Sequence, residues 1–180
     1  LLPGFVDSHM HLDKSFTLPK VPNRSGTLSE AIDNYHRVQP AFSKEEIRER
    51  IVRTALLALS FGSTVLRSHL DFHLNTGTEV AMRTIEAALE AREKVRHLTD
   101  IQFFPLCPYR NFRPKFLEVL EETIRMGMDG IGGAPHLSPT ADGDIRQLFR
   151  LADKLGCPID LHTDEDDDPD VRTILTIADE

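Results

Sequence analysis

The feature that most constrains the fold of this chain is an alternation of short apolar runs with longer stretches whose apolar residues recur at helical spacing. The alternation occurs five times and predicts parallel strands connected by helices. Ser43 and Glu46 have the spacing of a capping box at the start of the second helix. The expected strands cover residues 5–11, 64–69, 101–105, 129–134 and 158–162, and the expected helices cover residues 28–38, 43–62, 79–95, 116–126 and 144–155.

An open doubly wound sheet and a β/α barrel both fit this alternation. Polar residues with catalytic potential follow four of the five strands, and β/α barrels carry their active sites at that end of the strands. A doubly wound sheet usually binds its ligand beside a glycine-rich phosphate loop, and no such motif follows a strand here. We therefore predict a β/α (TIM-type) barrel. A full barrel has eight units and about 250 residues, so residues 1–180 are expected to be a single domain piece, the N-terminal five units of a longer protein.

Two histidines at the end of the first strand form a candidate metal site. Side chains at positions i and i+2 of a strand point to the same face, so His9 and His11 would converge while Met10 points away. Such a pair also occurs by chance on strands, where the histidines are only surface or core residues. A third imidazole, from His162 on the fifth strand, would leave open positions on Zn²⁺ or Fe²⁺, where the pKa of a bound water falls to about 7. Glu165, three residues after His162, is the candidate acid/base that moves protons.

Further polar residues at the strand ends are candidates for contacts with the substrate. His69, with Asp71 beside it, follows the second strand, His136 follows the fourth strand, and Asp164 follows the fifth. For both histidines the alternative is a hydrogen-bonded core residue. The acidic run at residues 164–170 is expected to be mostly a solvated loop. His36, His73 and His97 are assigned no role.

Composition limits the partners of the chain. A formal charge of −8 and a pI near 5.5 argue against nucleic acid or an anionic membrane as the main partner. No apolar run approaches the ~20 residues of a membrane span, and no signal peptide is evident. Cys107 and Cys157 are far apart and form no CxxC pair. We therefore expect a cytoplasmic protein with a small-molecule substrate, whose metal is held by histidines and carboxylates. A homo-oligomer is left open.

Four motifs in a fixed order carry a family resemblance: PGFVDSHMHLDK, LRSHLDF, GAPH and IDLHTDE. Together they resemble the amidohydrolase superfamily, and within it the cytosine deaminase-like branch. The resemblance implies a distorted β/α barrel with one divalent metal, Zn²⁺ or Fe²⁺. It implies His9, His11 and His162 as metal ligands and Glu165 as the proton-shuttling residue. It also implies a histidine on the sixth strand and a metal-binding aspartate on the eighth, both outside this sequence, so this piece alone is expected to be inactive.

Two departures from the family pattern bear on the chemistry. Binuclear members of the superfamily carry a lysine on the fourth strand, and residues 129–134 contain none, which favours one metal. Cytosine deaminases place a glutamine against the pyrimidine after the third strand, where this chain has Leu106, so cytosine itself would be recognised less well.

The resemblance therefore implies a hydrolase that acts on carbon–nitrogen bonds of cyclic amidines. It would deaminate a cytosine-like nitrogen heterocycle by attack of metal-bound hydroxide and release ammonia. One alternative is hydrolysis of a cyclic amide or of an N-alkylamino heterocycle by the same site. The other alternative is a non-catalytic barrel that binds a metal or a ligand.

Overall fold

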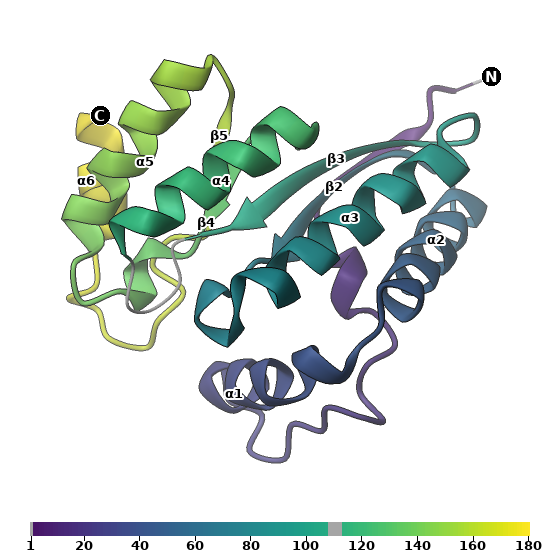
Figure 1. The fold of residues 1–180 in the computed structure, drawn as a ribbon, viewed down its shortest axis with the longest axis horizontal. Coiled ribbons are helices and arrows are strands. Elements are labelled where there is room, and N and C mark those ends of the chain that lie inside the picture. Colours follow the sequence, from purple (N-terminus) through teal and green to yellow (C-terminus); the bar gives the residue numbers. More distant parts are fainter. Residues whose placement is uncertain (1, 108–112) are drawn as a thin grey trace. The chain divides into compact units, whose positions relative to one another are not determined.

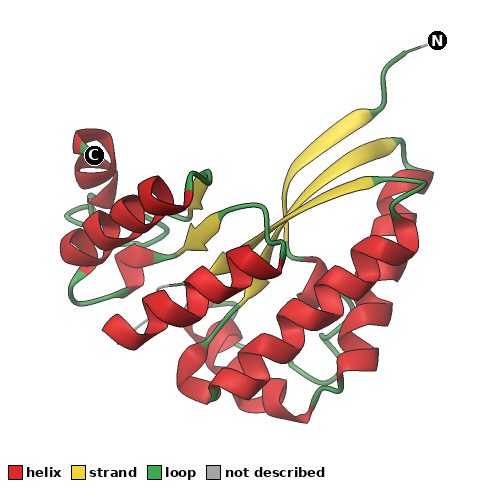
Figure 2. Cartoon of the chain, turned by 45° about the horizontal axis from the view of Figure 1, so that its top comes forward, coloured by secondary structure: helices red, strands yellow, loops and turns green. Residues whose placement is uncertain are grey.

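A computed structural model describes residues 2–107 and 113–180, and along them five strands alternate with helices (Figures 1 and 2). The strands form one sheet in the order β1-β2-β3-β4-β5, and the registered neighbours run parallel. This arrangement confirms the predicted first five units of a β/α barrel. The strands are β1 (Phe5–Met10), β2 (Ser63–Asp71), β3 (Asp100–Leu106), β4 (Ile131–Gly133) and β5 (Ile159–Leu161).

Capping signals in the sequence mark one helix start and two helix ends. Ser43 accepts a hydrogen bond from the Glu46 N–H while the Glu46 carboxylate accepts one from the Ser43 N–H, which confirms the capping box. Gly127 and Gly156 end α4 and α5 in the left-handed conformation, with φ of 113° and 63°. The helices are α1 (Leu28–Val38), α2 (Lys44–Ser60), α3 (Thr78–Val95), α4 (Pro114–Met126), α5 (Ala141–Leu155) and α6 (Thr173–Asp179). Short 3₁₀ turns are η1 (Leu12–Lys14), η2 (Gln39–Ala41), η3 (Leu74–Thr76) and η4 (Pro135–Leu137).

The chain divides into two compact units, Leu1–Gln102 and Phe103–Glu180. In the first unit, α2 and α3 pack side by side and both contact β2 (Figure 1). Their facing residues make an apolar core in which Ile51, Leu66 and Ile85 are fully buried. This core supports β2 from one side and leaves the ends of β1 and β2 to carry polar residues.

In the second unit, glycines let β4 approach the neighbouring strands closely. A Cβ atom on Gly132 would lie 2.7 Å from the Pro105 carbonyl oxygen, and one on Gly133 would lie 3.0 Å from that of Cys107. Any side chain at Gly132 would therefore push β4 away from β3. The close pairing sets the path of the chain into η4, which carries His136.

Within the part of the chain that the structure describes, no helix combines the length and apolar character needed to cross a membrane. Cys107 and Cys157 are both free thiols.

Candidate metal centre

Three histidines of the first unit gather where β1 and β2 end. β1 carries His9, His11 follows it directly, and β2 carries His69. The ring centroids of His9 and His11 lie 5.4 Å apart, and the His69 centroid lies 4.8 Å from His9 and 5.9 Å from His11. His69 is fully buried, whereas His9 is exposed and His11 is half-buried. The two predicted ligands are therefore the more accessible members of an imidazole cluster.

The second unit carries His136 and His162 at the ends of β4 and β5. The backbone N–H of His162 donates to the Gly133 carbonyl oxygen at 2.8 Å, which continues the pairing of β4 with β5. His136 is buried, and its Nδ1 lies 3.2 Å from the His162 carbonyl oxygen. His136 thus lies against the backbone of a predicted metal ligand, and its contact with substrate stays a prediction.

Asp164 lies two residues after His162, and its carboxylate is bound to the start of α6. The Thr173 N–H and hydroxyl each donate to its Oδ1 at 2.6 Å, and the Ile174 N–H donates to its Oδ2 at 3.2 Å. Burial alone would raise the pKa of Asp164, but these hydrogen bonds lower it. Its backbone has a φ of 55°, in the left-handed region that aspartate tolerates better than most residues. Asp164 therefore caps α6, and its predicted contact with substrate is not needed to explain its place.

Glu165 follows Asp164 directly, and its side chain is exposed. The rest of the acidic run is exposed as well, as expected for a solvated loop. Asp166 and Asp168 each accept a hydrogen bond from the backbone N–H two residues later, at 2.9 Å in both cases. The Asp164 carboxylate is thus held by hydrogen bonds to α6, whereas the next carboxylate, that of Glu165, is open to solvent.

Leu106 is the last residue of β3, and it is paired in register with Gly132 of β4. Its side chain is buried and offers no hydrogen-bonding group. Cys107 comes next and is also buried, and this burial raises the pKa of its thiol. The end of β3 is therefore apolar at the position where the family resemblance would place a glutamine.

Sequence reasoning missed a charged network in the first unit. Asp71, at the end of β2, is only 4% exposed, and its carboxylate lies 3.0 Å from Lys14 Nζ and 3.3 Å from His36 Nε2. The His36 ring stacks on His73 with centroids 3.7 Å apart and an interplanar angle of 1°. Two features of the sequence pointed to this network. They are the LDK sequence directly after the histidine pair and the spacing of His69, Asp71 and His73 on alternate residues.

Burial raises the pKa of both carboxyl groups of this network, but the neighbouring charges offset that rise to different extents. It raises the pKa of Asp13 to about 6, despite the nearby positive charge of Lys14. Burial alone would also raise the pKa of Asp71, but Lys14 and His36 together hold it well below its usual range. Asp71 is therefore the ionised centre of the network.

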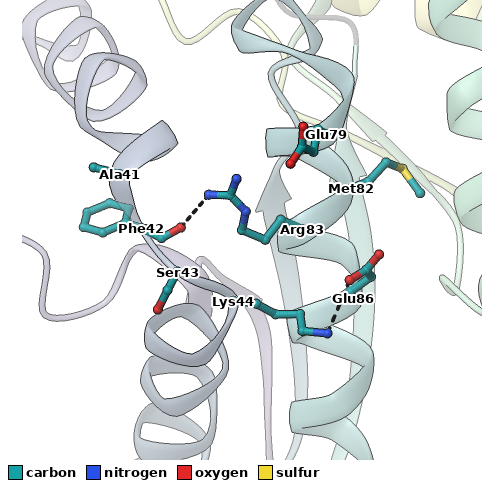
Figure 3. Close-up of a pocket in the computed structure, with 8 residues that line it drawn as sticks. All are labelled: Ala41, Phe42, Ser43, Lys44, Glu79, Met82, Arg83 and Glu86. Atoms are coloured by element: carbon teal, nitrogen blue, oxygen red, sulfur yellow. Dashed lines mark hydrogen bonds and ion pairs between the residues drawn. The ribbon is translucent and has the colours of Figure 1, made fainter.

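A separate pocket of about 580 Å³ opens in the first unit between the segment before α2 and the side of α3 (Figure 3). The Arg83 guanidinium crosses it and donates to the Phe42 carbonyl oxygen at 2.7 Å, and Lys44 lies 3.4 Å from Glu86. Lys44 and Glu86 are thus paired with each other, and Arg83 is bound to a backbone carbonyl. It contains none of the predicted site residues, being lined by Ala41, Phe42, Ser43, Lys44, Glu79, Met82, Arg83 and Glu86.

The strand-end histidines, the parallel sheet and the motifs agree with one family of hydrolases. The profile of the amidohydrolase family matches residues 1–177. The chain belongs to the amidohydrolase family.

Among solved structures, 5-methylcytosine deaminase from Klebsiella pneumoniae with bound 5-fluorocytosine is similar to this chain, with a TM-score of 0.88 and 31% identity over 98% of this chain and 43% of the other. N-isopropylammelide isopropyl amidohydrolase of Pseudomonas sp. (strain ADP) is 31% identical over 89% of this chain and 41% of its own length. Pterin deaminase of Rhizobium rhizogenes is 29% identical over 98% of this chain and 40% of its own length. The chain thus spans less than half the length of each of these relatives.

Proposed function

We propose that this chain is the N-terminal part of a metal-dependent hydrolase that deaminates a cytosine-like nitrogen heterocycle and releases ammonia. The observation that carries the proposal is the imidazole cluster at the ends of β1 and β2, in a chain of the amidohydrolase family. Similarity to 5-methylcytosine deaminase and pterin deaminase supports deamination of a ring amine.

One divalent metal, Zn²⁺ or Fe²⁺, fits the donor set of this chain. His9, His11 and His162 would each supply one ring nitrogen to that ion. Imidazole nitrogen suits both metals. When bound, the ion would lower the pKa of a coordinated water to about 7 and so supply a nucleophile at neutral pH. β4 has no lysine that could bridge a second ion, which supports a single metal.

Proton transfer falls to Glu165 in this proposal. Its carboxylate would accept a proton from the attacking water and deliver it to the leaving nitrogen, so that ammonia departs as a neutral molecule. The side chain is exposed and lies three residues after His162, which follows β5, so it is free to reach a substrate. His69, at the end of β2, and His136, after β4, are the proposed hydrogen-bonding groups for the polar edge of the ring.

A second candidate keeps the site and changes the leaving group. Leu106 places a buried apolar side chain where a pyrimidine-binding glutamine would be polar. One relative at 31% identity is N-isopropylammelide isopropyl amidohydrolase, whose name gives an N-isopropyl group. An apolar residue at this place would favour contact with an alkyl group. Hydrolysis of an N-alkylamino heterocycle is therefore the alternative, with an alkylamine as the product in place of ammonia.

The experiment uses the full-length protein loaded with Zn²⁺ or Fe²⁺ and a panel of aminopyrimidines, aminopurines, aminotriazines and their N-alkyl analogues. Ammonia release from any panel member supports the deaminase, and release of alkylamine without ammonia supports the alternative. The same protein stripped of its metal by a chelator serves as the matched control. A metal-loaded protein that produces neither product from the panel would overturn both hydrolase proposals.

A further inference from the structure

The turn that follows the predicted ligand His11 is attached to β2 at three successive residues. The Leu12 N–H donates to the Ser68 hydroxyl at 3.0 Å. The Asp13 Oδ2 accepts from the Asp71 N–H at 3.0 Å. The Lys14 ammonium lies 3.0 Å from the Asp71 carboxylate. Every residue of η1 is thus bound to the same end of β2.

These contacts are shielded from solvent. Leu12, Asp13 and Ser68 are fully buried, and Asp71 is 4% exposed. Charged groups interact more strongly away from water, and a buried hydrogen bond is lost only at the cost of an unsatisfied polar group. The turn therefore has one well-defined position relative to β2.

Asp71 also holds a third segment. His36, on α1, contacts its second carboxylate oxygen and stacks on His73, which follows β2. The one carboxylate therefore joins β2, the turn η1 and helix α1. An apolar side chain could fill the same space, and replacing a buried ion pair by apolar residues is often neutral for stability. What a carboxylate adds is a fixed direction for each of its partners.

We propose that Asp71 is a positioning residue that fixes the backbone leaving His11, and thereby the orientation of that imidazole toward the metal. Its carboxylate acts through Lys14, while its backbone N–H binds Asp13, and Asp71 does not itself bind the metal or the substrate. The inference rests on the proposed function, because it assumes that His11 is a metal ligand. Groups that orient a metal ligand without touching the metal typically change metal affinity by about 10–100-fold.

The test measures zinc affinity of the full-length protein by competition with a coloured chelator, and zinc loss to excess chelator as a rate. Asp71→Asn keeps the size of the side chain and removes its charge, and we expect zinc affinity to fall by about 10–100-fold. Lys14→Met should weaken zinc affinity in the same direction, and Lys14→Arg should restore it. The double variant Lys14→Met with Asp71→Asn should bind zinc no more weakly than Asp71→Asn alone, because both changes remove the same Lys14–Asp71 interaction.

Lys44→Met is the matched control. It breaks an exposed ion pair with Glu90, 2.8 Å apart, on the helices of the same unit, and zinc affinity should not change.

If Asp71→Asn fails to fold, the two variants of half-buried Lys14 carry the test alone. Zinc affinity within twofold of the parent in both Asp71→Asn and Lys14→Met, each with an unchanged melting temperature, would overturn the positioning role. If the positioning role is overturned in this way but the parent binds zinc and His11→Ala does not, the proposed metal centre still stands. A parent that binds no divalent metal would overturn both proposals.

Discussion

The turn after β1 and the loop after β5 both follow a predicted metal ligand, but different kinds of contact hold them. Residues 12–14 are bound to β2 by contacts between positions 56 and 58 residues apart in the sequence. The loop after His162 is held by Asp164, whose partners Thr173 and Ile174 are only 9 and 10 residues away. The first region depends on the packing of a whole unit, whereas the second is closed by its own following helix.

The two regions also differ in exposure, and this difference suggests a division of labour. Asp71 is buried among charged partners, whereas the loop that begins at Glu165 is exposed through residue 170. A buried network suits a ligand that must keep one orientation. A short capped loop suits a carboxylate that must move a proton between water and substrate. We therefore expect changes near β1 to act on metal affinity, and changes near β5 to act on the rate of turnover.

The largest effect is expected from His11→Ala in the full-length protein. His11→Ala removes one of the three imidazoles that this chain would supply to the metal. We expect both bound metal and turnover to be abolished, with the metal measured by elemental analysis. A full complement of metal in this variant would remove His11 from the ligand set. The turn after β1 would then no longer follow a metal ligand.

Glu165→Gln is expected to have the next largest effect, and it should separate the two regions. The amide cannot accept the proton, so turnover should fall by at least ~10²-fold, as is typical when a general acid/base is lost. Metal content should equal that of the parent, because Glu165 is not among the proposed ligands. A rate close to that of the parent would exclude Glu165 from proton transfer.

Leu106→Gln tests whether substrate selectivity depends on the end of β3, outside both the turn after β1 and the loop after β5. An amide at the end of β3 would offer the polar edge of cytosine one added hydrogen bond, worth about 1 kcal/mol and so roughly tenfold or less in kcat/KM. We expect cytosine deamination to increase by up to about this factor, measured as ammonia release, with Leu106→Met as the matched control. Equal rates for the two variants would show that this position does not select the substrate.

The fold and the strand-end candidates could be predicted from the sequence because their signals are local. The apolar periodicity fixed the alternation of strands and helices, and the spacing of Ser43 and Glu46 fixed a helix start. His9 and His11 converge because alternate residues of a strand share a face, a rule that needs no tertiary structure.

The network around Asp71 could not be predicted in the same way. Its partners Lys14 and His36 come from segments distant in the sequence, and nothing in the pattern of either segment specifies the other. Asp164 illustrates the same limit. Its position after a strand suggested a substrate contact, but its left-handed backbone and its contacts with Thr173 emerge only from the folded loop. Residues near a predicted site can thus be placed by sequence, whereas the direction of their side chains depends on packing.

The smallest effect is expected from Asp164→Ala, which tests the local character of the second region. Alanine removes the acceptor for the Thr173 and Ile174 N–H groups and fits the left-handed backbone poorly, and loss of a helix cap typically costs about 1 kcal/mol. Hydrogen exchange in the full-length protein should show faster exchange at these two amides, by roughly fivefold for each 1 kcal/mol. Asp164→Asn, which tolerates the same backbone and keeps one acceptor oxygen, should exchange more slowly than Asp164→Ala.

The pH dependence gives a second readout of the same cap. Because hydrogen bonds lower the pKa of Asp164 below its ordinary value of 3.8, the stabilisation is present above that pH and is lost as the pH falls through the lowered value. Amide protection of Thr173 should therefore be constant near neutral pH and decline only in acid, and the decline should be absent in Asp164→Asn. Metal affinity should match that of the parent in both Asp164 variants. A loss of metal affinity as large as that of Asp71→Asn would show that the loop after β5 positions its ligand as strongly as the turn after β1, and would end the distinction between the two regions.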